Sequence, residues 1–390
     1  MHLPIDNEIT AICAERIFDG RHWHRDAAVL IAEQRIRDMV AVSEIPRGCK
    51  ATYLPPGAIL APGFIDLQVN GGGGVLLNDD PSREAMRAIA CAHRRLGTAA
   101  LLPTLISDTR DKARAAIASA RAIAGQGGVI GLHLEGPFLN PARAGVHDPA
   151  RIAVAEMADL EWLRTLGQAG HSMITLAPEC VPEGFIRALV AAGIHVAAGH
   201  SEASAEIVSR AMAEGLTGVT HLFNAMPPFQ GRAPGLVGTA FAERGLTAGL
   251  IVDGIHVDPV SVRAAFHAKG AEGIALITDA MPSVGSDRTE FELAGRKVLL
   301  RDKRLVTEDG TLAGAHLDLA SAVRNTVTVC GIPPGDALRA ATHTPAKFLG
   351  LDHERGVLTA NAHADLVALD ENLRVISCWV DGMEKTEAWS

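Results

Sequence analysis

Three side chains that commonly bind metals stand at the ends of apolar segments or within them. Glu135 ends one such segment, His200 ends a second, and His221 interrupts a third. A carboxylate in a buried segment is costly unless a cation or a hydrogen bond compensates it. One carboxylate and two imidazoles form the ligand set of a catalytic zinc site, which leaves a position open for water. The alternative for Glu135 is a structural carboxylate held by Arg143.

A fourth ionisable residue, Asp279, ends another apolar segment. A carboxylate at this point can accept a proton from attacking water and later return it to a leaving group. An aspartate can also cap the turn that follows it, which is a common structural role. We favour the acid/base role, because Asp279 would lie on the same barrel face as the three expected metal ligands.

The segments that must position these residues alternate between short apolar runs and longer helical patterns. The apolar runs are residues 59–69, 99–103, 129–135, 173–177, 194–200, 219–222, 248–253 and 274–279. Helical patterns lie between them, for example at 82–96, 109–123 and 204–214. Apolar strands separated by helices indicate parallel strands that are covered on both faces. Eight such units close a barrel, so the expected fold class is α/β, a (β/α)8 TIM-type barrel.

The two ends of the chain have a different pattern, in which apolar and polar residues alternate as in half-buried strands. Such alternation occurs at residues 8–19, 27–42, 365–369 and 375–380. We expect these segments to form a small β-sandwich domain from 1–57 plus 347–390, beside a barrel domain at 58–346. Residues 291–312 also have the pattern of a β-hairpin, inserted after the last barrel strand.

Composition excludes several classes of partner and location. The 390 residues have a formal net charge of −9, which opposes binding to nucleic acid or to an anionic membrane surface. The six cysteines are far apart and form no Cys-x-x-Cys pair, as is usual for reduced thiols. No apolar run reaches the roughly 18 residues of a membrane span, and the first ten residues do not resemble a signal peptide. We therefore expect a cytoplasmic protein.

The segment 62–70 resembles the opening strand of the amidohydrolase superfamily. In that superfamily the strand often ends in His-x-His, which binds a second metal ion. Here the corresponding residues are Gln68 and Asn70, whose neutral amides are poor zinc ligands. No lysine ends the fourth apolar run, where binuclear relatives have a bridging carbamate. One divalent metal ion per subunit is therefore expected, with Zn²⁺ preferred and Fe²⁺, Co²⁺ or Mn²⁺ compatible with the same ligands.

More specifically, the sequence resembles the N-acetylglucosamine-6-phosphate deacetylases. The resemblance is carried by residues 62–70, 133–140, 199–201, 218–228, 232–238, 253–257, 278–281 and 311–314, with 341–370 as the usual superfamily tail. The string 220–228 is the most specific of these segments. Together they extend from the first barrel strand to the last.

The resemblance also implies roles for individual residues. Glu135, His200 and His221 bind the metal, Asp279 is the acid/base, and His147 is a second catalytic residue that contacts the acetamido carbonyl. The implied substrate-binding set is Val146, His147, Asn224, Ala225, Arg232, His256, Leu312, Ala313 and Gly314.

Two of these residues imply a homodimer. In the family, the pair that corresponds to Arg232 and His256 binds the substrate phosphate across a dimer interface. The planar guanidinium of Arg232 can bind a phosphate through two parallel hydrogen bonds. From the residues alone, Arg232 in its Gly/Pro-rich loop is equally consistent with a solvated surface side chain.

These observations predict hydrolysis of N-acetyl-D-glucosamine 6-phosphate to D-glucosamine 6-phosphate and acetate, by a metal-activated water with Asp279 as acid/base. One alternative is a deacetylase of another N-acetylhexosamine phosphate, such as N-acetylgalactosamine 6-phosphate. A second alternative is a non-catalytic sugar-phosphate-binding barrel. The presence of Glu135, His200, His221 and Asp279 together argues against this second alternative, because a binding protein has no need of all four.

Overall fold

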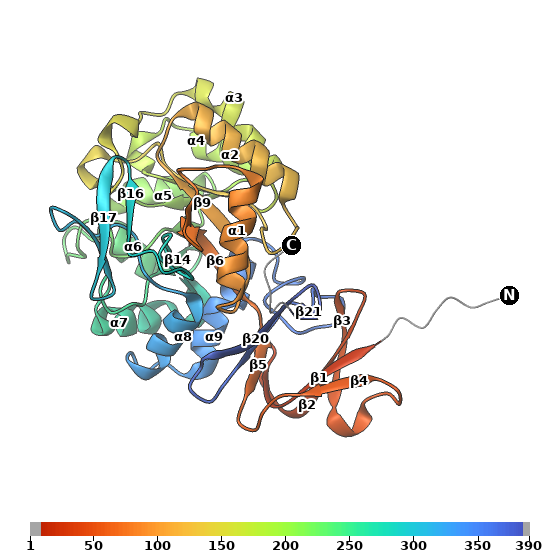
Figure 1. Ribbon diagram of the computed structural model, residues 1–390. Helices are drawn as coiled ribbons and strands as arrows, with labels where there is room; N and C mark the ends of the chain where they lie inside the picture. The colour runs from red at the N-terminus through yellow and green to blue at the C-terminus, as the bar shows by residue number, and fades with distance from the viewer. Residues whose placement is uncertain (1–8, 385–390) are drawn as a thin grey trace.

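The larger part of the molecule is a closed barrel of parallel strands (Figure 1). The computed structural model describes residues 9–384. The barrel strands are β6 (Phe64–Val69), β9 (Thr98–Ile106), β10 (His133–Glu135), β11 (Met173–Leu176), β12 (His195–Ala198), β13 (Gly218–Val219), β14 (Thr247–Leu250) and β15 (Ile274–Leu276). Neighbouring strands are parallel, and a bridge between Val69 and Ala280 joins the two ends of the row. The expected (β/α)8 barrel is therefore confirmed.

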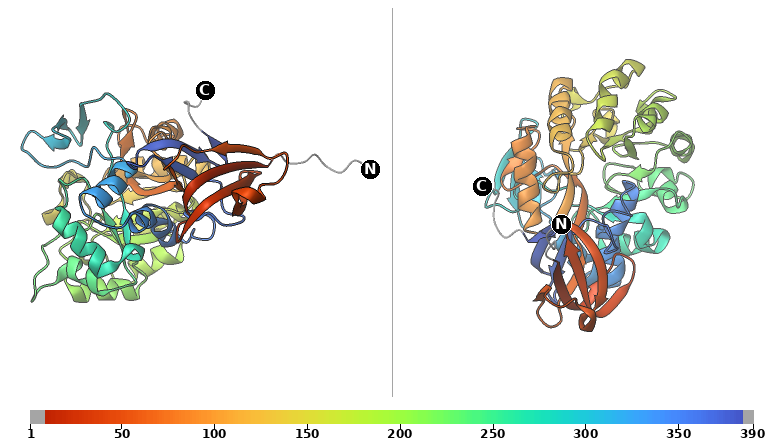
Figure 2. Two further views of the ribbon diagram at one scale, coloured as in Figure 1. Left: turned by 90° about the horizontal axis from the view of Figure 1, so that it is seen from below. Right: turned by 90° about the vertical axis from the view of Figure 1, so that its right-hand side faces the viewer.

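Helices cover the outside of this barrel (Figures 1 and 2). The principal ones are α1 (Arg83–Arg94), α2 (Arg110–Ile123), α4 (Phe185–Ala191), α5 (Ala205–Ala213), α6 (Gly235–Ala242), α7 (Pro259–Lys269), α8 (Leu319–Thr328), α9 (Pro334–Ala341) and α10 (His343–Phe348). The helices α1, α2 and α5 begin where the sequence predicted. Each follows an N-cap residue, Ser82, Thr109 or Ser204, whose hydroxyl accepts a hydrogen bond from the first turn.

The apolar run 59–69 is two strands and not one, which corrects the sequence interpretation. β5 (Ile59–Pro62) pairs with strands from the chain termini, and only β6 belongs to the barrel. Gly63 separates them, and a Cβ atom there would lie 2.3 Å from the Cβ of Ala99. Every residue of both strands is buried, so the pattern of the run does not reveal the change of sheet. The division at residue 58 stays a prediction, with β5 on the side of the smaller sheet.

The smaller sheet is built from both ends of the described chain. Its other strands are β1 (Thr10–Phe18), β2 (Trp23–Ala32), β3 (Arg35–Ala41), β4 (Lys50–Tyr53), β19 (Leu366–Leu369), β20 (Val375–Val380) and β21 (Met383–Glu384). The first half of β1 pairs with β4 and its second half with β5, so the sheet divides there. Apolar side chains of the two halves, among them Val29 and Leu366, pack in one core. The expected β domain is thus present.

Two details of this sheet differ from the sequence pattern. The predicted strand 27–42 contains a turn at Glu33 and Gln34, whose φ angles are +52° and +66°. β2 and β3 are therefore separate antiparallel strands. Residue 8 of the predicted strand 8–19 lies outside the described residues. Residues 1–8 and 385–390 of the predicted β domain also lie outside the described residues. Most of the first ten residues, which the signal-peptide prediction concerned, are among them.

A third, small sheet follows the last barrel strand. It consists of β16 (Glu290–Leu293), β17 (Arg296–Arg301) and β18 (Arg304–Thr307), so the predicted hairpin contains one more strand than a simple hairpin. Figure 2 shows this sheet on the side of the barrel opposite to the terminal β sheet. Its apolar residues pack against Met281, Ala313 and Val146. Among residues 9–384, no helix has both the length and the apolar character needed to cross a membrane.

Candidate metal centre and active site

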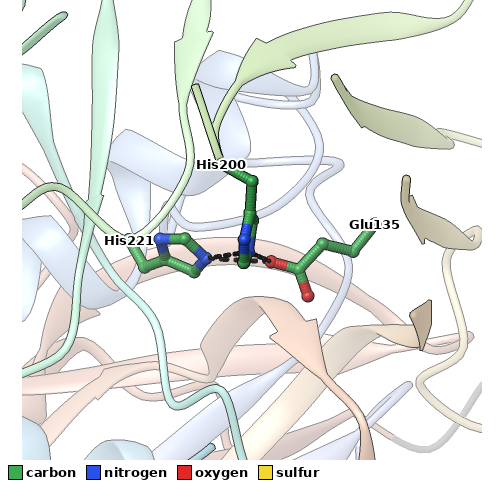
Figure 3. A group of neighbouring side chains, drawn as sticks. All are labelled: Glu135, His200 and His221. Carbon is green, nitrogen blue, oxygen red and sulfur yellow. Dashed lines mark hydrogen bonds and ion pairs between the residues drawn. The ribbon is translucent and has the colours of Figure 1, made fainter. Parts of the chain in front are cut away.

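Glu135, His200 and His221 converge on one point at the carboxyl ends of three barrel strands (Figure 3). Glu135 Oε1 lies 3.1 Å from His200 Nε2 and 2.9 Å from His221 Nε2, and the two Nε2 atoms are 3.0 Å apart. All three residues are buried. Within the part of the chain that the structure describes, this is the one cluster of histidine, cysteine and acidic residues that could hold a metal ion.

The tautomer of His200 makes this cluster a site for a cation. His200 Nδ1 lies 2.8 Å from the carbonyl oxygen of Arg143, which can only accept a hydrogen bond. Nδ1 therefore carries a proton, and Nε2 is the ring nitrogen that faces Glu135 Oε1. The Nε2 atom and the carboxylate oxygen are 3.1 Å apart, a distance that is favourable only if a metal ion or a proton lies between them. Ligand atoms around a tetrahedral zinc ion are roughly 3.3 Å apart, close to the spacing of this triangle.

The pKa shifts of Glu135 and His221 also favour positive charge at the centre. Burial alone would raise the pKa of Glu135, but its contacts with His200 and His221 outweigh burial and hold that pKa well below its usual range. Burial would lower the pKa of His221, but Glu135 outweighs it and raises that pKa. The carboxylate thus stays ionised and stabilises positive charge among the three ligand atoms. Arg143, the expected alternative partner of Glu135, instead forms an ion pair with Glu202.

The backbone at the ends of these strands is unusual. His200, His221, Asp279 and Ala225 have φ angles of +49°, +29°, +52° and +52°. Residues other than glycine disfavour this region, at a cost of roughly 1–3 kcal/mol each. The surrounding barrel must therefore hold these residues in place. Strained residues of this kind cluster at binding and catalytic sites, and here they border one cavity.

Asp279 lies beside the centre and is held by two amides of the first barrel strand and its end. Asn70 Nδ2 and Gln68 Nε2 donate to Asp279 Oδ1 over 2.6 and 3.0 Å. The carboxylate is therefore bound to side chains of the adjacent strand β6 and its end, and the turn-capping alternative is not observed. Burial and the negative charge of Glu135 raise the pKa of Asp279 to about 6, although Asn70 opposes the shift. A carboxylate with that pKa exchanges protons readily near neutral pH.

His147 is buried on another wall of the same cavity. Its Nδ1 accepts a hydrogen bond from the backbone N–H of Ser107 over 3.3 Å and lies 2.9 Å from the hydroxyl oxygen of Ser107. Since Nδ1 is an acceptor, the proton of the neutral ring is on Nε2. Burial and the neighbouring His200 lower the pKa of His147 to about 3, so the ring stays neutral. His147 Nε2 lies 3.9 Å from Glu135 Oε2 and is a hydrogen-bond donor next to the centre.

These residues border a cavity of about 230 Å³. Most of the predicted substrate-binding residues line it: Val146, His147, Asn224, Ala225, His256, Leu312 and Gly314. Two predicted residues do not. Ala313 is buried in the apolar core of the small third sheet, and Arg232 is exposed outside the cavity. Nothing in residues 9–384 forms a hydrogen bond or ion pair with the Arg232 side chain, so this chain alone does not bring it to the site.

Sequence reasoning gave no positioning role to four residues that hold the site together, although it had noted Glu179 and Asp253 at the ends of apolar runs. Asn70 was considered only as a poor metal ligand, but its amide binds Asp279. Ser107 follows the second barrel strand and orients His147, and Asp253 Oδ2 lies 2.7 Å from His256 Nδ1. Glu179, after the fourth strand, accepts hydrogen bonds from the loop that contains His200. The sequence did contain a signal for these four residues, because each follows or ends an apolar run. Their contacts were not predictable, because they form only when the barrel closes.

Comparison with known proteins places these features in a family. The model of the family described as "Amidohydrolase family" matches residues 59–385. N-acetylgalactosamine-6-phosphate deacetylase from Shewanella sp. (strain ANA-3) is 44% identical over 85% of this chain and 84% of its own length. N-acetylglucosamine-6-phosphate deacetylase from Homo sapiens is 35% identical over 92% of this chain and 90% of its own. The crystal structure of N-acetylglucosamine-6-phosphate deacetylase from Pasteurella multocida has a TM-score of 0.93 at 32% identity, covering 97% and 100% of the two chains.

Replacing Asn70 should raise the pKa of Asp279. The amide donates to the ionised carboxylate, so its loss in Asn70→Ala destabilises the anion and favours the protonated form. We expect a rise on the order of one unit, because such a bond contributes about 1.5–3 kcal/mol and one unit equals about 1.4 kcal/mol. Titration of the Asp279 carboxyl carbon by NMR in the metal-free protein measures this pKa.

The control is Gln68→Ala, which removes the longer hydrogen bond to Asp279 and should give a smaller rise in its pKa. An unchanged or lower pKa in Asn70→Ala would contradict this assignment.

Proposed function

The chain belongs to the amidohydrolase family, and from this premise we propose that it hydrolyses N-acetyl-D-glucosamine 6-phosphate to D-glucosamine 6-phosphate and acetate. The observation that carries the proposal is the meeting of three groups in one cavity. They are the Glu135, His200 and His221 cluster, the carboxylate of Asp279 and the neutral imidazole of His147. The names of two relatives that match over most of this chain support the same reaction.

In this proposal Glu135, His200 and His221 hold one divalent cation per subunit. Two imidazoles and a carboxylate suit Zn²⁺ best, and Fe²⁺, Co²⁺ or Mn²⁺ are compatible with the same ligands. When bound, such a cation polarises the acetamide carbonyl and lowers the pKa of a water molecule that it coordinates. The amides of Gln68 and Asn70 are already engaged with Asp279, which supports a single metal ion.

The remaining chemistry falls to Asp279 and His147. Asp279 accepts one proton of the attacking water while the water oxygen adds to the acetamide carbon. The carbonyl oxygen becomes an oxyanion, to which the Nε2–H of His147 donates a hydrogen bond. When the C–N bond breaks, Asp279 returns its proton to the departing nitrogen, and the products are acetate and a free amine. The pKa of Asp279, near 6, suits a group that must both take and give a proton.

The phosphate group of the substrate is proposed to bind at the part of the cavity that His256 lines. His256 lines that cavity, and its contact with Asp253 fixes the imidazole. Arg232 is exposed and has a free guanidinium in the described chain, so we propose that it reaches the cavity of a second copy in a homodimer. Asn224, Ala225 and Val146 contact the sugar, and the backbone of Leu312, Ala313 and Gly314 closes over it.

A second candidate substrate is N-acetylgalactosamine 6-phosphate. The observation in its favour is the 44% identity to the Shewanella deacetylase of that sugar phosphate, against 35% to the human enzyme. The two sugars differ only in the configuration of one hydroxyl group, and the acetamide chemistry is the same.

A cytoplasmic location is also part of the proposal, supported by six cysteines that are all unpaired.

Acetate release is the experiment that tests the proposed function. Purified protein should release acetate from N-acetylglucosamine 6-phosphate, lose this activity after chelation, and regain it with Zn²⁺. Unphosphorylated N-acetylglucosamine should react far more slowly, because it has no group for His256 and Arg232 to bind. Faster release from the galactosamine epimer would favour the second candidate. No release from either phosphorylated sugar by zinc-loaded protein would refute the function.

Removal of the His147 donor should lower turnover without removing the metal. One well-placed oxyanion donor contributes on the order of 10²- to 10³-fold to kcat, so His147→Ala should lose about that much. Zinc content, measured by atomic emission, should match wild type because the three ligands remain. The control is His353→Ala, which removes a histidine whose side chain is 70% exposed. A kcat in His147→Ala equal to that of the control would rule out the role given to His147.

A further inference from the structure

Glu179 binds the two loops that surround His200. It lies in a short 3-10 helix, Pro178–Cys180, which follows barrel strand β11. Its carboxylate accepts three hydrogen bonds, from Ser201 Oγ at 2.7 Å, from the Glu202 backbone N–H at 2.6 Å and from Asn140 Nδ2 at 3.0 Å. The side chain is a neighbour of the proposed metal ligands and not one of them.

The first two bonds hold the chain directly after His200. Ser201 and Glu202 are the next two residues, and both are bound to the same carboxylate. The His200 backbone has a φ angle of +49°, a conformation that a residue with a side chain disfavours. Without an external anchor, this part of the loop would relax toward ordinary angles and turn the imidazole away. The carboxylate of Glu179 is such an anchor.

The third bond holds the turn that orients the imidazole ring. Asn140 caps the 3-10 helix Pro141–Arg143, and its own backbone N–H donates to the carbonyl oxygen of His200 over 2.9 Å. The last residue of this helix, Arg143, provides the carbonyl that accepts from His200 Nδ1. Glu179 therefore stabilises both the backbone of His200 and the acceptor that fixes its tautomer.

We propose that Glu179 is a positioning residue that sets the affinity of the centre for its metal ion. Residues that orient a ligand histidine without touching the metal contribute to affinity, because an ordered imidazole loses less entropy when the cation binds. The hydrogen bonds of Glu179 go to the two residues after His200 and to Asn140, whose backbone N–H also donates to the His200 carbonyl. The inference rests on the proposed metal site, so its test must first establish that wild-type protein binds zinc.

The test is the zinc dissociation constant of full-length variants, measured by competition with a chromophoric chelator. Glu179→Ala removes all three hydrogen bonds and should weaken zinc binding on the order of 10- to 100-fold. Glu179→Gln should recover most of the affinity. Its amide oxygen can accept from Glu202 and Asn140, and its NH₂ group can donate to the Ser201 hydroxyl. At saturating zinc, turnover of Glu179→Ala should return close to the wild-type value.

The matched control is Glu183→Ala. Glu183 is an exposed glutamate on the same loop with no hydrogen bond or ion pair in the described chain, so its removal changes the net charge equally. If Glu179→Ala does not fold, Ser201→Ala, which removes one of the three bonds, should still weaken zinc binding several-fold. Zinc affinity at the wild-type level in whichever of these two variants folds overturns the proposal, even if thermal stability falls. Failure of the wild-type protein to bind zinc refutes the metal site itself.

Discussion

The arrangement of this candidate metal centre depends on one close contact, between His200 Nε2 and Glu135 Oε1, which is repulsive unless a metal ion or a proton lies between the two atoms. Because His200 donates its Nδ1 proton to the carbonyl of Arg143, its Nε2 faces Glu135 Oε1, with His221 Nε2 completing the triangle. Three buried ligand atoms about 3 Å apart are unfavourable without a cation. The barrel holds them there because each lies at the end of a different parallel strand, whose position is fixed by the closed ring.

The charge of this centre also determines the ionisation of its neighbours. Burial raises the pKa of Asp279, and the ionised Glu135 nearby raises it further, which favours proton exchange near neutrality. His147 packs against the His200 ring and is buried, so it stays neutral and keeps a donor on Nε2. Asp279 is proposed to take and return a proton, whereas His147 is proposed to stay neutral and donate a hydrogen bond. The neighbouring cluster of Glu135, His200 and His221 favours both states.

The sequence predicted the elements of the barrel better than the contacts between them. Continuous apolar runs indicated the strands and helical patterns indicated the helices, and residues such as Glu135 stood out because polar groups seldom end a buried strand. The split of 59–69 into β5 and β6 was not predictable, because both strands are buried throughout and pair with different sheets only in the folded chain. The roles of Asn70 and Glu179 were hidden for a related reason. Their partners lie far away in the sequence and meet only when the barrel closes.

The most direct test of the account is anomalous X-ray diffraction at the zinc edge from crystals of zinc-loaded protein. We expect one anomalous peak per subunit, about 2.0–2.2 Å from Glu135 Oε1, His200 Nε2 and His221 Nε2. That result would establish a metal ion between these three atoms. A zinc ion bound elsewhere, or three ligand atoms that remain in contact with no ion between them in zinc-soaked crystals, would contradict it.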